Sequence, residues 1–154
     1  MKVTLLTHSR ELGRETNSGR LVMECLGSNV EQIVWDRVNP NIGLVEEIEQ
    51  GSMGLLFPTL NDDETSDVSA FENILIIDAT WQEANKIYNK SPYLKAAPKV
   101  ALPKGLTSNY QLRRNQPEGG LCTAECVIEI LKLKQEQSLA EKLSQQYQDF
   151  NTRN

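Results

Sequence analysis

The stretch Ile74-Leu75-Ile76-Ile77-Asp78-Ala79-Thr80-Trp81 decides the fold. Its first four residues are all apolar, which is typical of a β-strand that is covered on both faces. Thr80 and Glu83 have the spacing of a capping box, so the pattern predicts a helix that begins at Trp81. A buried strand that leads directly into a helix indicates an α/β sheet with mainly parallel strands.

Strands and helices alternate on both sides of this stretch. Apolar or β-branched runs predict strands at 2–6, 30–35, 55–57 and 100–102. Amphipathic spacing predicts helices at 18–26 with Thr16 or Asn17 as the cap, after 39–41, at 123–134, and at about 138–150 with a Ser138/Glu141 capping box. We expect 59–69 to be a solvated acidic loop. The sequence thus predicts one α/β domain over 1–154, with a mainly parallel sheet and helices on both faces.

Composition is that of an ordinary globular domain. Of the 154 residues, 39% are hydrophobic and 24% are charged, close to the globular average. No apolar run approaches the roughly 20 residues that a bilayer requires, and the apolar start is too short for a secretory signal, so we expect a soluble cytoplasmic protein. Cys25, Cys122 and Cys126 lack zinc-ribbon spacing, so free thiols are expected.

The net charge is -5, but the charges are segregated along the chain. Residues 24–72 hold eleven acidic side chains and one basic side chain, whereas residues 84–117 hold seven basic side chains and no acidic one. Such segregation favours a positive face that a phosphate backbone could contact. A solvated lysine-bearing helix followed by a polar loop explains the pattern equally well, and both interpretations stay open.

The polar stretch from Pro103 to Gly120 is long for a loop within one compact domain, and loops of this length are usually functional. It contains Ser108, Tyr110 and Arg113. Hydroxyls, a guanidinium and glycine N–H groups suit a carboxylate, ribose or phosphate. The sequence lacks GxGxxG and the Walker lysine, so classical dinucleotide and nucleoside triphosphate sites are not supported.

Asp78 stands where the buried strand leads into the helix, the position at which parallel α/β enzymes place catalytic groups. A second interpretation makes it an accessory cap that accepts N–H bonds beside Thr80. Trp81 is either a stacking platform for an unstacked base or a core residue. The only histidine, His8, is interpreted as a loop residue near the first strand.

Asp78-Ala79-Thr80-Trp81 resembles the D-x-T-W signature of the DTW-domain family. The resemblance extends, in order, over about residues 7–131. It includes His8-Ser9-Arg10-Glu11, Thr16-Asn17-Ser18-Gly19-Arg20-Leu21, Leu56-Phe57-Pro58, Ser91-Pro92, Ser108-x-Tyr110-x-x-Arg113, Glu118-Gly119 and Leu121-Cys122-Thr123-x-Glu125. Ser9 replaces a frequent proline, and Ala79 replaces a common glycine.

The resemblance implies a SPOUT-like fold with a C-terminal trefoil knot. It also implies transfer of the 3-amino-3-carboxypropyl group of S-adenosylmethionine to N3 of a tRNA uridine, with release of 5'-methylthioadenosine. Many members carry a zinc-holding cysteine cluster ahead of the first strand. This chain starts too late to contain one, so no metal is expected.

The resemblance also assigns residues. Asp78 is expected to be the general base or N3–H acceptor, Thr80 to cap the helix and orient Asp78, and Trp81 to wall the cofactor or stack on the base. The expected cofactor-binding residues are Leu56, Phe57, Pro58, Ile77, Leu102, Ser108, Tyr110, Arg113, Leu121, Cys122, Thr123 and Glu125. The expected RNA phosphate contacts are Arg10, Arg14, Arg20, Lys86 and Lys90.

Three alternatives remain at this point. A SPOUT-type RNA methyltransferase would use the same co-substrate but transfer its methyl group. A non-catalytic RNA-binding module would keep the fold without the reaction. The RNA target could also be ribosomal RNA, because related knotted proteins modify ribosomal RNA with the same arm.

Overall fold

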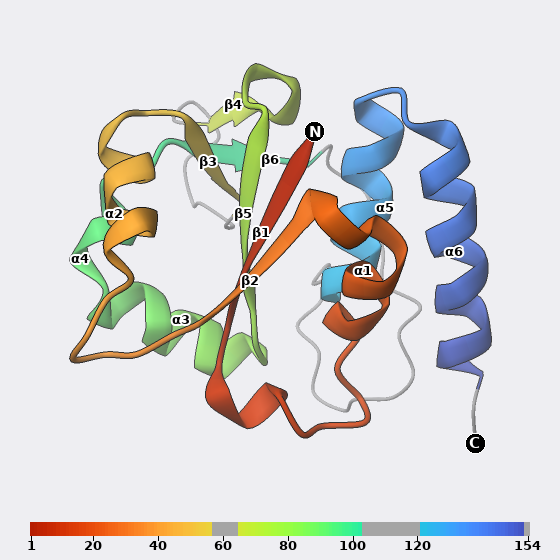
Figure 1. Cartoon of the computed structure of the whole chain (residues 1–154), viewed down its shortest axis with the longest axis horizontal. Helices are drawn as coiled ribbons and strands as arrows, with labels where there is room; N and C mark the ends of the chain where they lie inside the picture. Colours follow the sequence, from red (N-terminus) through yellow and green to blue (C-terminus); the bar gives the residue numbers. More distant parts are fainter. Residues whose placement is uncertain (57–64, 103–120, 153–154) are drawn as a thin grey trace.

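The computed structural model describes residues 1–56, 65–102 and 121–152. Six strands in these ranges form one sheet in which every neighbouring pair is parallel, with the order β2-β1-β5-β3-β6-β4 (Figure 1). They are β1 (Lys2–Thr7), β2 (Val30–Val34), β3 (Met53–Leu56), β4 (Thr65–Asp67), β5 (Asn73–Asp78) and β6 (Lys99–Ala101). The prediction of a parallel α/β sheet is confirmed.

Helices cover both faces of the sheet, as predicted (Figure 1). The α-helices are α1 (Gly19–Leu26), α2 (Ile42–Glu49), α3 (Trp81–Lys90), α4 (Pro92–Lys95), α5 (Thr123–Leu133) and α6 (Gln137–Asn151), and the short 3-10 helices are η1 (Ser9–Glu11), η2 (Gly27–Asn29) and η4 (Val68–Ala70). α1, α5 and α6 pack on one face, and α2, α3 and α4 pack on the other. None of the described helices has both the length and the apolar character needed to cross a bilayer.

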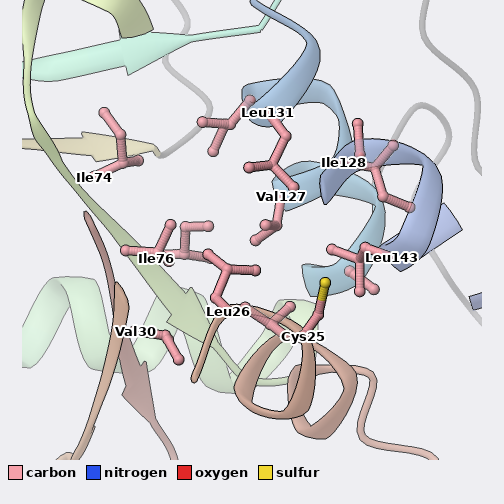
Figure 2. Close-up of a cluster of buried hydrophobic side chains, with 14 of the residues drawn as sticks. Cys25, Leu26, Val30, Ile74, Ile76, Val127, Ile128, Leu131 and Leu143 are labelled. Atoms are coloured by element: carbon pink, nitrogen blue, oxygen red, sulfur yellow. The ribbon is translucent and has the colours of Figure 1, made fainter. Parts of the chain in front are cut away.

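Strand β5 is buried at all six positions because each face of the sheet has its own core. Ile74 and Ile76 point into the cluster with α1, α5 and α6, whereas Leu75 and Ile77 point into the cluster with α2, α3 and α4. Figure 2 shows members of the first cluster, which include Cys25, Leu26, Val30, Val127, Ile128, Leu131 and Leu143. Burying one side chain of this size contributes about 1.5–3 kcal/mol, so the two clusters hold the helices to the sheet.

Several local predictions were wrong. Thr65–Asp67 forms the edge strand β4 beside β6, followed by η4, although the region was predicted as loop. Tertiary pairing overrides the low strand propensity of serine and aspartate there. Helix α4 was not predicted, and α6 begins at Gln137 after Glu136, so the Ser138/Glu141 capping box is not formed.

The N-cap residue of α1 is Ser18 rather than Thr16 or Asn17. The Asn17 side chain nevertheless accepts a hydrogen bond from the backbone N of Arg20. Gly27 ends α1 with a φ of 53°, a conformation that favours glycine. Residues 103–120 lie outside the described residues, and the C-terminal knot stays a prediction.

Candidate active site

The carboxyl ends of β1 and β5 bring polar residues together at one edge of the sheet. Thr7 and Asp78 are register partners, and the backbone N of His8 donates to the Asp78 carbonyl at 3.2 Å. Asp78 is only 1% exposed, and Thr7 is fully buried. Two strand ends therefore place a carboxylate inside the protein at the edge where parallel sheets bind ligands.

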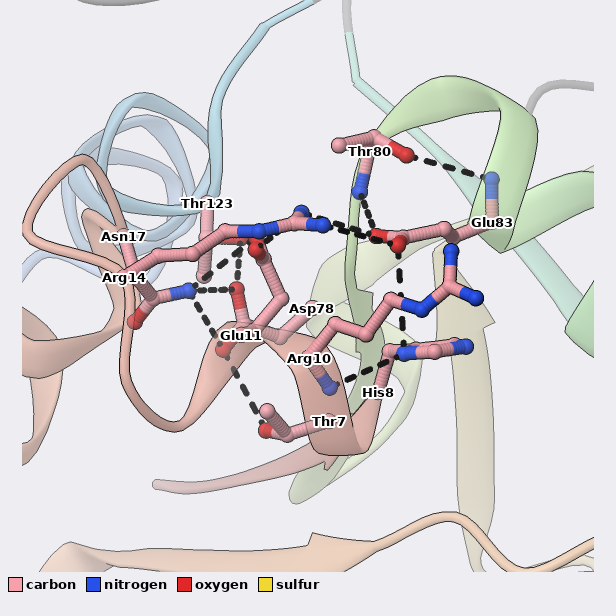
Figure 3. Close-up of polar contacts among 10 residues, drawn as sticks. All are labelled: Thr7, His8, Arg10, Glu11, Arg14, Asn17, Asp78, Thr80, Glu83 and Thr123. Carbon is pink, nitrogen blue, oxygen red and sulfur yellow. Dashed lines mark hydrogen bonds and ion pairs between the residues drawn. The ribbon is translucent and has the colours of Figure 1, made fainter.

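The Asp78 carboxylate accepts hydrogen bonds from three side chains (Figure 3). Oδ1 accepts from Thr123 Oγ1 at 2.8 Å and from Asn17 Nδ2 at 3.0 Å. Oδ2 accepts from Thr7 Oγ1 and Asn17 Nδ2, both at 3.2 Å. Among the described residues, these partners come from β1, α5 and the turn before α1, and none is a backbone N–H of α3. The interpretation of Asp78 as a cap of that helix is therefore wrong.

Burial raises the pKa of Asp78, because it disfavours the charged carboxylate. The hydrogen bonds from Thr123 and Asn17 oppose this rise in pKa, and the nearby negative charge of Glu11 adds to it. The net direction is upward, so the Asp78 carboxylate holds a proton more readily than an exposed aspartate would.

Gly19 permits the close approach of α1 to this carboxylate. A Cβ atom at position 19 would lie 2.5 Å from Asp78 Oδ2 and 2.9 Å from its Cγ. The preceding residue, Ser18, accepts a hydrogen bond through Oγ from the backbone N of Ala124 at 3.1 Å. The amino ends of α1 and α5 are thus joined to each other beside Asp78.

A second layer of charged groups lies next to this carboxylate (Figure 3). Glu11, 1% exposed, accepts from Arg14 Nη1 at 2.6 Å and from Asn17 Nδ2 at 3.4 Å. Arg14 also donates to both carboxylate oxygens of Glu83. Burial alone would raise the pKa of Glu83, but its hydrogen bonds with Arg14 and Thr80 outweigh burial and lower it.

His8 is more than a loop residue, because its side chain is part of this layer. Its Nδ1 accepts from the backbone N of Arg10 at 3.1 Å, and its ring stacks on Trp35 with 6.1 Å between centroids. His8 Nδ1 also lies 3.9 Å from Glu83 Oε2.

The three predicted catalytic residues occupy different environments. Asp78 lies at the centre of the buried network. Thr80 and Glu83 form the predicted capping box of α3, in which the Thr80 side chain accepts from the Glu83 backbone N. Trp81 is 42% exposed, so of its two interpretations the one as a core residue is wrong, and the one as a stacking platform stays a prediction.

Several predicted cofactor-binding residues lie at the carboxyl edge of three adjacent strands. Leu56 is the register partner of Ile76 and Val100, so it lies between the ends of β5 and β6, and Ile77 and Leu102 follow along the same edge. Leu56, Leu102 and Cys122 pack against the same core cluster. Phe57, Pro58, Ser108, Tyr110 and Arg113 lie outside the described residues.

The remaining predicted cofactor residues surround the start of α5. Leu121 and Cys122 are half-buried and lead into Thr123. Glu125 is buried and accepts from the Cys122 backbone N at 3.0 Å, which gives it a capping role. Burial raises the pKa of Cys122 to about 12, and its thiol is free. In 1–56, 65–102 and 121–152, no group of three His, Cys, Asp or Glu side chains could hold a metal ion.

The predicted RNA-contacting cations lie on elements that pack on both faces of the sheet. Lys86 and Lys90 are exposed on α3, whereas Arg20 is exposed on α1, on the other face of the sheet. Arg10 is exposed on η1 near the site. Arg14 is paired with two carboxylates, so much of its charge is already offset.

Five residues of the two layers around Asp78 were not predicted as site residues from the sequence: Thr7, His8, Glu11, Asn17 and Glu83. Thr7 ends a strand, and a parallel partner of β5 would bring it level with Asp78. Glu11 belongs to the motif at residues 8–11, and Asn17 belongs to the motif at residues 16–21. The burial of both side chains depends on packing against distant parts of the chain. The motifs could therefore have drawn attention to Glu11 and Asn17, but the sequence did not show that both side chains lie beside Asp78.

Comparison with known proteins gives two findings. A family model described as the DTW domain matches residues 1–154. No solved structure matches the chain. The family match covers every residue of the network around Asp78.

Proposed function

The chain belongs to the DTW-domain family, and from this premise we propose that it transfers the 3-amino-3-carboxypropyl arm of S-adenosylmethionine to N3 of a uridine in tRNA. Membership of this family is consistent with an enzyme that modifies tRNA, and such an enzyme has RNA as its substrate. 5'-Methylthioadenosine is the leaving group. The observation that carries the proposal is the enclosed Asp78 carboxylate at the end of the central strand, because the reaction needs an acceptor for the N3 proton.

Asp78 is the final acceptor of that proton in the proposed reaction. An ordinary aspartate is far too acidic to take a proton from N3 efficiently, and burial raises the pKa of this one. Thr80 fixes the start of α3, and Trp81, which is 42% exposed, is the proposed stacking partner of the splayed base or the cofactor. Lys86, Lys90 and Arg10 are exposed and supply phosphate contacts.

The edge formed by β3, β5 and β6 is proposed to hold S-adenosylmethionine. Leu56 and Leu102, which are half-buried against the same core cluster, supply apolar surface suited to a nucleoside. Ile77 lies near the end of the neighbouring strand β5 with its side chain in the other cluster, and Thr123 supplies a hydroxyl beside Asp78. The sulfonium makes its attached carbons electrophilic, so the residues that orient it decide which carbon faces the base. The predicted residues outside the described ranges remain part of this proposal.

The proposed fold is SPOUT-like with a C-terminal knot. The parallel sheet with helices on both faces is compatible with it. A crystal structure that traces residues 103–120 with bound S-adenosylmethionine tests both the knot and the cofactor edge. A chain that closes without passing through a loop would contradict the knot.

The reaction is tested with purified protein, tRNA and S-adenosylmethionine labelled only in the aminocarboxypropyl arm. We expect label in a uridine derivative after nucleoside mass analysis, together with methylthioadenosine. Release of S-adenosylhomocysteine would instead identify a methyltransferase. Absence of S-adenosylmethionine binding in calorimetry would favour the RNA-binding module, and label in ribosomal RNA alone would change the substrate.

A further inference from the structure

The Asp78 carboxylate is too enclosed to meet a pyrimidine directly. Both of its oxygens already accept two hydrogen bonds from Thr7, Asn17 and Thr123. Gly19 packs so closely that even a methyl group there would overlap Oδ2. A general base must come within about 2.6–3.2 Å of the atom whose proton it takes. A uridine ring would have to displace one of these partners to reach Asp78.

Thr123 is the outermost of the three residues that donate to Asp78. It is 9% exposed, compared with 2% for Asn17 and 0% for Thr7. Thr123 Oγ1 lies 2.8 Å from Asp78 Oδ1 and donates its hydroxyl hydrogen to it. The lone pairs of Thr123 Oγ1 therefore point away from the carboxylate. Among the described residues no side chain or backbone group donates to Thr123 Oγ1, so this oxygen has an acceptor direction that the buried carboxylate lacks.

We propose that the Thr123 hydroxyl is the group that meets the substrate, and that it relays the N3 proton to Asp78. This inference rests on the proposed function and identifies the atom that acts in it. The N3–H bond breaks as its proton moves to Thr123 Oγ1, and the proton of Thr123 moves to Asp78 Oδ1. The N3 electron pair forms the bond to the methylene carbon of the arm, and the carbon–sulfur electron pair leaves with methylthioadenosine.

The surroundings of both residues favour this relay. Thr123 is the first residue of α5, where the helix dipole stabilises negative charge that develops on its oxygen. Asp78 becomes neutral when it accepts the proton, and burial already favours the neutral form. The negative charge of Glu11 also raises the pKa of Asp78 and so acts in the same direction. The relay thus removes a buried charge instead of creating one.

Three variants test the relay. Thr123→Val keeps the shape of the side chain and removes the hydroxyl, whereas Thr123→Ser keeps the hydroxyl. Thr4→Val is the matched control, because it also removes one buried hydroxyl donor from the sheet, but that hydroxyl donates to Asn73 and not to Asp78. Transfer to tRNA is measured in a single turnover, S-adenosylmethionine affinity by calorimetry, and folding by thermal unfolding.

We expect Thr123→Val to lower the single-turnover rate by about 100-fold or more, the usual size of a general-base contribution, while affinity for S-adenosylmethionine falls far less. Thr123→Ser should stay within about tenfold of the wild type, as should Thr4→Val. The single-turnover rate of the wild type should also be measured in mixtures of light and heavy water. Its dependence on the deuterium fraction should be that of a step in which two protons move together. A Thr123→Val rate close to that of the wild type would overturn the relay.

The proposed function and the relay fail in different ways. If the wild type transfers no arm to RNA, the proposed function fails. If the wild type transfers the arm and the heavy-water series shows a single moving proton, the relay alone fails. The heavy-water series uses the unaltered protein, so it decides the question even if Thr123→Val does not fold.

Discussion

Arg14 reaches Glu83 with both terminal nitrogens of its guanidinium, each 3.1 Å from a carboxylate oxygen. The same guanidinium donates to Glu11, whose side chain has no exposed surface. The contact joins the first turn of α3 to the segment that follows β1. It therefore fixes two sides of the candidate active site relative to each other.

Replacement of Arg14 by Met should destabilise the protein because it removes the guanidinium that pairs with the buried Glu11 carboxylate and with Glu83. We expect a loss of about 2 kcal/mol in the free energy of unfolding, less than the roughly 3–5 kcal/mol of a fully buried pair, since Arg14 is partly exposed. Urea unfolding measures it. Lys132→Met removes an exposed pair with Glu129 and should cost less than about 1 kcal/mol. Equal losses would contradict a special role for Arg14.

Gly19→Ala should disturb the site directly. Its Cβ would overlap Asp78 Oδ2, so α1 must move away, which we expect to cost about 1–3 kcal/mol. Gly13→Ala is the matched control, because its Cβ would meet nothing within 4 Å. Thermal unfolding compares the two variants. A Gly19→Ala protein as stable as Gly13→Ala would show that α1 is not held against Asp78.

The raised pKa of Asp78 should appear in the pH dependence of stability. Burial favours the protonated form in the folded state, so the contribution of this group is complete at low pH and is lost as the pH rises through the folded pKa. Asp78→Asn cannot titrate. We therefore expect the unfolding free energy of the wild type minus that of the variant to fall as the pH rises above about 4. Urea unfolding at several pH values checks this, and a rising difference would mean that the pKa is lowered.

Lys86→Glu combined with Lys90→Glu should weaken binding to tRNA. Both side chains are exposed on α3, and lost phosphate contacts reduce the salt dependence of binding as well as the affinity. Lys132→Glu with Lys142→Glu makes the same change in net charge on α5 and α6. Affinity is measured by filter binding over a salt series. Equal effects from the two pairs would assign the loss to net charge instead of to α3.

The sheet and its helices could be predicted because their signals are local. The apolar run before Asp78 and the capping box of Thr80 and Glu83 both lie within ten residues, and both are confirmed. Strand β4 has no such signal, since its residues favour loops and only pairing with β6 makes them a strand. Edge pairing of three residues cannot be deduced from composition.

The candidate site was predictable only in part. The position of Asp78 at a strand end follows from the alternation of strands and helices. Its burial by Thr7, Asn17 and Thr123 does not, because these residues come from distant parts of the chain. The ion pairs of Arg14 were also missed, since a basic residue in a polar turn gives no sign of two carboxylates that fold against it.

The central pairing of β1 with β5 has a consequence for how the protein forms. Thr7 and Asp78 are 71 residues apart, and Asn17 and Asp78 are 61 apart, so a large loop must close before these side chains can meet. Non-local topology of this kind slows folding and makes it cooperative. Neither half of the chain alone contains both the Asp78 carboxylate and all of the side chains that donate hydrogen bonds to it. Catalytic competence should therefore emerge late during refolding, and fragments cut between β1 and β5 should regain it only when they are recombined.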